Sequence, residues 1–495
     1  MIMNNNNNNN NHNNNTFLKD NEKLYNFLNQ NKETLKFLRI CWVDVGNKIR
    51  CKSLSVEWIL KHKPEAIHVT VTDTCMSFMA FQDSIVKDAL PDGNVIFGEV
   101  YLIPDVSTIT ILPYNKSHAQ VFGSFYKVNK TTGDLEPWKL CPRECLKKAI
   151  KELLITASLS LKGSFEEEFY LIKKNDKLSS TTNEDQELEK MLNESSQVDR
   201  NTFASFHSLD SHSAILNEIL DNLSKQSIPV EQMLSESGPG QFEITVDYSD
   251  ILTACDRHII FRQTVHSVAS LNGYIATFIP KLYDYQAGNG CHAHLSLWNA
   301  NDDTNITPDP NSECGVGLLT QNFIGGILEH AHSLTALFNA TSNSYERLKP
   351  FCWSGCSIAW GLDNKEAFVR VPSSPFSRSC TNFEVKTIDH SSNPYLAISA
   401  IIYSGLDGIN KHTTPPKPTS LNPSTLSDKE CKEMKISFIP STITDAINYL
   451  KSNDYLCNSL GKEISNAYIQ VKLSEESILS KLSNNHKKLK LLELY

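Results

Sequence analysis

The feature that most limits the possible folds is a set of four short segments in which Glu or His alternates with large apolar residues. The segments are FEEEFYLI (165–172), QFEITV (241–246), CHAHLSLW (291–298) and NFEVKT (382–387). Because successive side chains of a β-strand point to opposite faces, each segment predicts a strand with an apolar back and a polar front. We therefore expect a sheet whose two faces differ sharply in polarity.

The predicted polar fronts carry carboxylates and imidazoles. The residues concerned are Glu166 and Glu168, Glu243, His292, His294 and Ser296, and Glu384, with Glu236 upstream of the second segment across a Gly-Pro-Gly turn. For any one segment, the simpler interpretation is that the polar face is the solvated side of a sheet. Glu166 and Glu168, however, would repel each other as neighbours on one face unless a cation lies between them.

A joint site of this composition favours divalent metal ions. Clustered carboxylates with one or two imidazoles suit hard ions such as Mg²⁺ or Mn²⁺. Two such ions in one cleft indicate phosphoryl transfer, because they neutralise charge on the transferred group. The sequence has no GxxxxGKS/T loop, so ATP would have to be held by other residues. An oxygenase-type iron site is the alternative use of the HxH pattern, and the excess of carboxylates argues against it.

Two arginines are candidates for the other half of a phosphate or carboxylate site. Arg347 lies in NSYERLKP, and Arg370 ends the apolar segment EAFVRVP. The planar guanidinium group matches the oxygens of both anions. The alternative for each is a surface arginine or a simple ion pair.

Composition argues against several classes of function and location. The formal net charge of −9 disfavours nucleic acid or an anionic membrane as the main partner. No apolar run approaches the roughly 20 residues that a membrane span needs, and the N-terminus has no apolar signal-peptide core. The 13 cysteines are scattered without a CxxC pair, which is typical of reduced thiols and argues against a cysteine-based zinc site. We therefore expect a cytoplasmic protein.

The chain is long enough, at 495 residues, for two domains. We expect a disordered Asn-rich tail over residues 1–18, a helix over about 19–38 and a β-hairpin over 38–54. A helix over about 142–160 opens the second part, and the polar residues 173–201 predict an exposed insertion. Further helices are expected over 213–228, 255–272 and 319–340.

From about residue 38 to residue 480, the chain resembles the type I glutamine synthetases. The matching segments, in the family's order, are FEEEFYL, ESGPGQFE, AGNGCHAHLSLW, NSYERLKP, NKEAFVRVP and NFEVKTIDHSSNPYLAISAIIYSGLDGI. The resemblance implies an α+β fold with an N-terminal β-grasp domain at 19–130. It also implies a catalytic domain at 138–495, an open barrel of mainly antiparallel strands flanked by helices. The family forms double rings, usually homododecamers, with active sites at subunit interfaces.

The resemblance further implies a role for each candidate residue. One metal ion would bind Glu168, Glu236 and Glu243, and another would bind Glu166, His292 and Glu384, among two or three Mg²⁺ or Mn²⁺ ions in all. The nucleotide would contact His294, Ser296, Lys365 and Arg370. Glutamate would contact Gly288, Arg347 and Lys386, and the catalytic residues would be Arg347 and Arg370.

The implied reaction joins an amine to the γ-carboxylate of L-glutamate through γ-glutamyl phosphate formed from ATP, most simply glutamine synthesis from ammonia. Several positions depart from the ammonia-using pattern. Ala287 replaces an asparagine that helps to hold glutamate, Trp353 replaces a flap glutamate, and no DGSS segment supplies an aspartate to polarise ammonium. Lysines stand at 365 and 386 in place of arginines, which loses the bidentate fork.

These departures leave two alternatives open. They resemble the branch that contains γ-glutamyl-polyamine ligases and nodulin-type homologues, so a larger amine is an alternative substrate. A non-catalytic structural homologue is the other alternative. It is expected to have lost metal ligands, whereas this chain retains all six.

Overall fold

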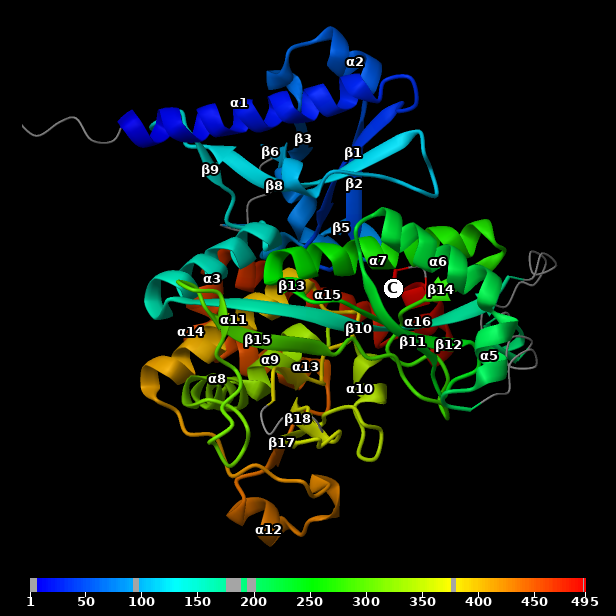
Figure 1. Ribbon diagram of the computed structural model, residues 1–495, viewed down its shortest axis with the longest axis vertical. Coiled ribbons are helices and arrows are strands. Elements are labelled where there is room, and N and C mark those ends of the chain that lie inside the picture. The colour runs from blue at the N-terminus through cyan, green and yellow to red at the C-terminus, as the bar shows by residue number, and fades with distance from the viewer. Residues whose placement is uncertain (1–6, 92–97, 175–187, 194–201, 375–379, 493) are drawn as a thin grey trace, which may run out of the picture.

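The computed structural model describes residues 7–91, 98–174, 188–193, 202–374, 380–492 and 494–495. Within these ranges, two large β-sheets and their helices form the α+β fold that the sequence predicts (Figure 1). The N-terminal sheet, in blue and cyan, stands above the larger sheet in the view of Figure 1. Strands pair antiparallel in both sheets except for β1 with β8 and β17 with β18.

The N-terminal sheet has the strand order β2-β1-β8-β6-β3, with β7 and β9 paired to β8. Its strands are β1 Phe37–Val43, β2 Ile49–Ser55, β3 Val69–Thr72, β6 Glu99–Pro104, β7 Thr110–Ile111, β8 His118–Val128 and β9 Leu135–Pro137. The predicted hairpin is confirmed as β1 and β2, and Asn47 takes a φ of 75° in its turn. Because β9 pairs with β8, this sheet continues past residue 130, where we expected its domain to end.

Helix α1 (Asn7–Gln30) crosses the N-terminal sheet (Figure 1). Leu24 and Leu28 lie one turn apart on its buried face and have no exposed surface. The helix includes residues 7–18, which we expected to be disordered, and ends eight residues before the expected boundary at 38. Helices are costly to nucleate and cheap to extend, so a segment fixed by packing can continue into residues that would not nucleate a helix.

The larger sheet has the strand order β11-β12-β10-β15-β19-β18-β17-β20. Its strands are β10 Leu159–Lys173, β11 Val230–Ser235, β12 Gln241–Val246, β13 Ser249–Asp250, β14 Tyr274–Thr277, β15 Ala293–Asn299, β16 Thr304–Asn305, β17 Ser357–Leu362, β18 Ala367–Val371, β19 Phe383–Val385 and β20 Ser437–Phe438. The long strand β10 pairs with β12 and β14 along one half and with β13 and β15 along the other. A short hairpin, β4 (Phe78–Met79) with β5 (Gln82–Ile85), stands apart from both sheets.

Helices cover the larger sheet (Figure 1). They are α3 Pro142–Ala157, α5 Phe206–Ser211, α6 Ser213–Lys225, α7 Ile251–Leu271, α8 Leu318–Glu329, α9 Ala331–Phe338, α10 Ser344–Arg347, α11 Pro394–Lys411, α12 Asp428–Glu433, α13 Ile443–Lys451, α14 Asp454–Leu460, α15 Lys462–Leu479 and α16 Asn484–Leu492, with α2 Val56–Lys61 in the N-terminal part. Among the described residues, no helix has both the length and the apolar character needed to cross a membrane.

Most of the expected insertion at 173–201 lies outside the described residues. Residues 188–193 are described, and there Leu188 and Met191 are 0% and 7% exposed. The expectation of full exposure is therefore wrong for this short piece, because its two apolar side chains pack into the core.

The hairpin turn of the N-terminal sheet packs against the start of α11. The Asn47 side chain donates a hydrogen bond to the carbonyl of His390, and the Asn393 side chain donates one to the carbonyl of Asp44. The Asn393 oxygen also accepts from the first backbone amides of α11, so this residue caps the helix. A second contact joins the buried Lys472–Glu475 ion pair of α15 to the carbonyl of Gly46.

Candidate active site

The four segments with predicted polar fronts become neighbouring strands of one sheet, in the order β12, β10, β15, β19. Glu168 lies opposite Glu243, and His294 lies opposite Ser164 on one side and Glu384 on the other. Residues directly opposite each other in antiparallel strands share a face, so the four polar fronts merge. The prediction of strands with an apolar back and a polar front is confirmed.

The glycine loop before β15 lets side chains and backbone approach closely. A Cβ atom at Gly290 would lie 2.5 Å from His292 Nε2 and 2.9 Å from Glu168 Oε1. A Cβ atom at Gly288 would lie 2.4 Å from the carbonyl of Pro280 and 2.6 Å from Arg347 Cγ. Only glycine fits at position 288, because the nearest atom there belongs to the backbone, whereas a Cβ atom at position 290 would displace the ends of the His292 and Glu168 side chains.

One part of the merged face is a dense set of acidic and basic groups. His292 Nδ1 lies 2.9 Å from Glu166 Oε2 and 3.2 Å from Glu384 Oε1. His294 Nε2 lies 2.9 Å from Glu166 Oε1. On the other side of Glu384, Arg370 Nη1 and Lys386 Nζ lie 2.9 Å and 3.0 Å from its two oxygens.

These basic neighbours keep two carboxylates ionised, those of the half-buried Glu166 and the buried Glu384. Burial alone would raise the pKa of Glu166, but hydrogen bonds from His292 and His294 lower it well below its usual range. Burial opposes ionisation of Glu384 as well, and Lys386 followed by the two histidines lowers its pKa to about 2. The same carboxylates raise the pKa of His294 to about 9, despite its burial.

The other part of the face is acidic, and nearby cations compensate its carboxylates only in part. Burial and the nearby charge of Glu236 raise the pKa of Glu168 to about 8. Burial, Glu166 and Glu168 raise the pKa of Glu243 to about 9, and burial raises that of Glu236. Glu168 accepts one hydrogen bond, 2.8 Å long, from the backbone of Gly290. Carboxylates that are this costly to ionise together are typical of a site completed by a cation.

The donor set fits divalent metal ions. Within the described ranges, Glu166, His294 and Glu384 are one of two groups whose possible ligand atoms all lie within 4.8 Å of one another. The resemblance assigns His292 rather than His294 to that ion, and His292 contacts the same two carboxylates. The acidic set Glu168, Glu236 and Glu243 offers the oxygen ligands that Mg²⁺ and Mn²⁺ prefer.

The two candidate arginines differ in their surroundings. Arg347 is buried, and its Nη2 donates to the carbonyls of Thr387 and Ile388, so the interpretation as a surface arginine is wrong for it. Its Nε has no hydrogen-bond partner, which leaves one donor for another group. Arg370 is half-buried and forms the ion pair with Glu384 that the simpler alternative describes.

Two other predicted residues lie toward the edge of the face. Ser296 accepts a hydrogen bond from Trp298 Nε1, on the same front of β15. Lys365 is exposed, and its Nζ lies 5.5 Å from the centre of the Trp353 ring. Trp353 is itself 58% exposed and has a φ of 52°. The charge of Lys365 still reaches the acidic set, because it offsets part of the rise in the pKa of Glu236.

Two residues outside the predicted set position the site. Tyr170 is buried and donates a hydrogen bond from its hydroxyl to the carbonyl of Ala287, which holds the glycine loop. Asn382 contacts His294 Nδ1 through its side-chain oxygen at 3.0 Å. Both follow from the alternation itself, because Tyr170 continues the Glu166, Glu168 face and Asn382 lies two residues before Glu384.

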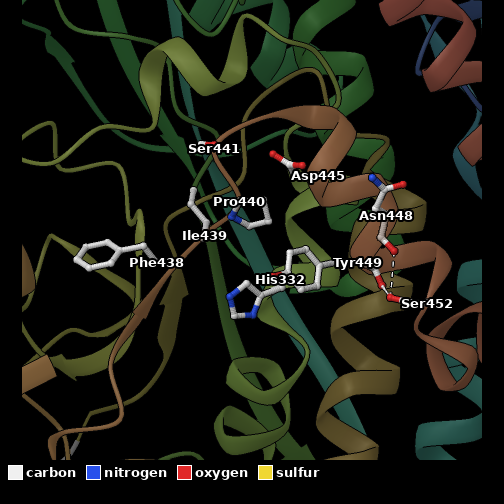
Figure 2. Close-up of a pocket in the computed structure, with 9 residues that line it drawn as sticks. All are labelled: His332, Phe438, Ile439, Pro440, Ser441, Asp445, Asn448, Tyr449 and Ser452. Carbon is white, nitrogen blue, oxygen red and sulfur yellow. Dashed lines mark hydrogen bonds between the residues drawn. The ribbon is translucent and has the colours of Figure 1, made fainter. Parts of the chain in front are cut away.

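A separate surface pocket lies away from these carboxylates. Figure 2 shows it between β20 and helix α13, with a volume of about 440 Å³. Its lining residues are His332, Phe438, Ile439, Pro440, Ser441, Asp445, Asn448, Tyr449 and Ser452. One carboxylate and one imidazole line it, so it lacks the clustered acid and base groups found on the merged face.

Comparisons with known proteins agree with this geometry. The family profile described as glutamine synthetase, catalytic domain, matches residues 139–488. Type-1 glutamine synthetase 1 of Dictyostelium discoideum is 55% identical over 464 residues, which is 93% of this chain and 90% of the relative. A glutamine synthetase of Staphylococcus aureus is 30% identical over 467 residues, covering 93% and 95% of the two chains.

Solved structures of similar proteins share the fold of this chain. A GmaS/ADP complex superimposes with a TM-score of 0.75 at 25% identity, covering 94% of this chain and 99% of that one. A structure described as a novel glutamine synthase homolog reaches a TM-score of 0.76 at 23% identity, covering 93% and 99%. With a family profile over most of its length and a relative at 55% identity, this chain belongs to the glutamine synthetase family.

Proposed function

We propose that the protein is an ATP-dependent ligase that joins an amine to the γ-carboxylate of L-glutamate, with ammonia as the simplest amine and glutamine as the product. The observation that carries the proposal is the merged face of β12, β10, β15 and β19. There, three carboxylates with raised pKa values lie beside a compensated Glu, His, Arg and Lys set. Membership of the family supports the same chemistry.

The reaction has two steps. The γ-phosphoryl group of ATP passes to the γ-carboxylate of glutamate, and ADP leaves. The amine nitrogen then attacks the γ-carbonyl carbon and gives up a proton, the bond from that carbon to the phosphate oxygen breaks, and inorganic phosphate leaves with this oxygen and its electron pair. Bound divalent ions supply neutralisation of phosphate charge.

We assign the residues of this chain as follows. One ion would be held by Glu168, Glu236 and Glu243, and the other by Glu166, His292 and Glu384. Arg370 and Lys365 would offset charge on the phosphates. The nucleotide would contact His294 and Ser296, and glutamate would contact Gly288, Arg347 and Lys386. Arg347 has an unpaired buried donor, which supports its role in binding an anion.

A larger amine is the second candidate. Ala287 and Trp353 favour it, because both replace residues that serve glutamate and ammonium binding in the ammonia-using pattern. Trp353 offers an exposed aromatic surface beside Lys365, where an alkyl chain could pack. Neither substitution touches the buried carboxylates, so the two candidates share the phosphoryl-transfer step.

We further propose that the protein works as a homododecamer in the cytoplasm, with Mg²⁺ or Mn²⁺ as its metal ion. Family membership supports the ring assembly. The scattered cysteines support a reducing compartment, since all 13 are free thiols in the structure.

Phosphate release from Mg·ATP and glutamate tests the function, with ammonia, putrescine or ethylamine supplied in turn. Release that depends on ammonia supports glutamine synthesis, and release only with the larger amines moves the assignment to the second candidate. No stimulation by any amine would remove the ligase proposal. Reactions without glutamate control for simple ATP hydrolysis.

A further inference from the structure

We propose that the protein binds a structural Zn²⁺ ion in its interior, behind the catalytic face, through Glu167, His258, Cys291 and His390. Each of the four side chains is buried, and their possible ligand atoms all lie within 4.8 Å of one another. Four protein ligands are the usual number for structural zinc. None of these residues belongs to the candidate active site.

The spacing of the donor atoms is close to that of a tetrahedral zinc site. His258 Nδ1 lies 2.9 Å from Glu167 Oε1 and 3.7 Å from Cys291 Sγ, and His390 Nδ1 lies 3.7 Å from Glu167 Oε2. Zinc bond lengths of about 2.0 Å to nitrogen or oxygen and about 2.3 Å to sulfur imply separations of about 3.3 Å and about 3.6 Å. These three separations differ from the expected ones by about 0.1 to 0.4 Å, and the remaining pairs of donor atoms lie within 4.8 Å of each other.

An independent observation is that His390 is buried without a hydrogen-bond partner of usual geometry. The residue is 0% exposed, and neither of its ring nitrogens has a hydrogen-bond partner of usual geometry. The backbone of Gly290 lies near enough to the ring to raise its pKa slightly against the larger lowering effects, but outside the usual hydrogen-bond geometry. Buried polar atoms are normally satisfied, so an imidazole with a free nitrogen facing Glu167 and His258 indicates a missing partner. Burial and the nearby positive charges also lower its pKa well below the usual range, which keeps a lone pair free.

The charges of the donor set suit a divalent ion in a dry interior. One carboxylate and one thiolate balance the two positive charges, and the two imidazoles are neutral ligands. Binding replaces the Cys291 proton by zinc, and that proton leaves to solvent with no change of oxidation state. The proton of His258 then resides on Nε2, because Nδ1 is the atom that faces the cluster.

The scattered spacing of the cysteines disfavours only zinc sites built from cysteines close in sequence. In this cluster one cysteine combines with ligands from three other segments. Glu167 comes from β10, His258 from α7, and Cys291 and His390 from the loops before β15 and α11. In the sequence, Glu167 is recognisable as a carboxylate on the otherwise apolar back of its strand, but its partners are not.

The ion would link β10 to the glycine loop on the side of the sheet opposite the candidate active site. Glu167 lies between the two front carboxylates Glu166 and Glu168, and Cys291 directly precedes His292. Zinc would thus hold β10 and the glycine loop in a fixed relation, which positions ligands on the opposite face.

Cobalt titration tests the proposal. Full-length protein is stripped with a chelator, saturated with Mg²⁺ and titrated with Co²⁺, whose thiolate complexes have a charge-transfer absorption. We expect one equivalent per chain to produce this band and Zn²⁺ to displace it. Cys291→Ser should abolish the band. The matched control is Cys255→Ser, which alters another fully buried cysteine, on α7, whose thiol contacts the carbonyl of Pro394 instead.

The second variant, His390→Ala, should weaken zinc binding by about 100-fold or more. Circular dichroism checks that each variant folds; if Cys291→Ser does not, the wild-type stoichiometry and His390→Ala decide. Wild-type protein with no thiolate band and no stoichiometric zinc by elemental analysis would overturn the proposal. The cluster would then be a metal-free hydrogen-bonded pair of His258 and Glu167. Ligase activity is not the readout, so this outcome is separate from failure of the proposed function.

Discussion

Gly290→Ala should disable the active site through steric displacement alone. The added Cβ would lie 2.5 Å from His292 Nε2 and 2.9 Å from Glu168 Oε1. Ordinary contacts begin near 3.4 Å, so the imidazole must move by about 0.9 Å and the carboxylate by about 0.5 Å. A misplacement of about 1 Å in a catalytic constellation costs on the order of 100-fold in rate. Overpacking should also lower the free energy of unfolding by about 1–3 kcal/mol.

Amine-stimulated phosphate release at saturating Mg²⁺ measures the first effect, and thermal melting measures the second. The matched control is Gly273→Ala, where the Cβ meets nothing within 4 Å but the φ of 73° is strained for alanine. That variant should lose about 1–2 kcal/mol of stability and keep its turnover rate. If Gly290→Ala retains activity within about twofold of the wild type, the ligand roles of His292 and Glu168 are wrong.

Three further outcomes are expected. Glu168→Ala should abolish metal-dependent turnover and leave the oligomer intact in size-exclusion chromatography. In chelator, the free energy of unfolding should fall as the pH rises from about 4.3, the unfolded pKa of a glutamate, to about 8 and about 9, the raised pKa values of Glu168 and Glu243, and should level off above that range, because the folded protein holds extra protons only between these values; Mg²⁺ or Glu243→Gln should flatten that melting profile. Glu475→Leu should cost about 3–5 kcal/mol in denaturant unfolding, because it leaves the buried ammonium of Lys472 unpaired, and a loss below about 1 kcal/mol would contradict this.

The strand faces were predictable from sequence because alternation is a local property. Glu166, Glu168 and Glu243 needed only their apolar neighbours to be assigned to a polar front. The order of the strands was not predictable in the same way, since pairing β10 with β12 on one edge and β15 on the other joins residues far apart in sequence. The resemblance supplied that long-range information by grouping the segments into one site.

Other features depended on tertiary surroundings. Nothing in the local pattern indicated that Glu167 would meet His258 and His390, because the three lie on separate elements and only packing joins them. The composition of the Asn-rich start of α1 predicts disorder. The helix nevertheless extends into this segment, because the buried side chains of Leu24 and Leu28 hold the rest of α1 against the protein. The role of Ala287 as the acceptor for Tyr170 is also invisible in sequence, since a backbone carbonyl carries no residue signature.

The side chain of Asn393 has a consequence for how the molecule opens. Its oxygen accepts from the first amides of α11 and its nitrogen donates to Asp44 in the hairpin turn. Local opening of the hairpin would thus also disturb the start of a helix in which 15 residues are buried. Amide hydrogen exchange in the hairpin and in the first turn of α11 should accordingly share one opening free energy, making the two sheets a single cooperative folding unit.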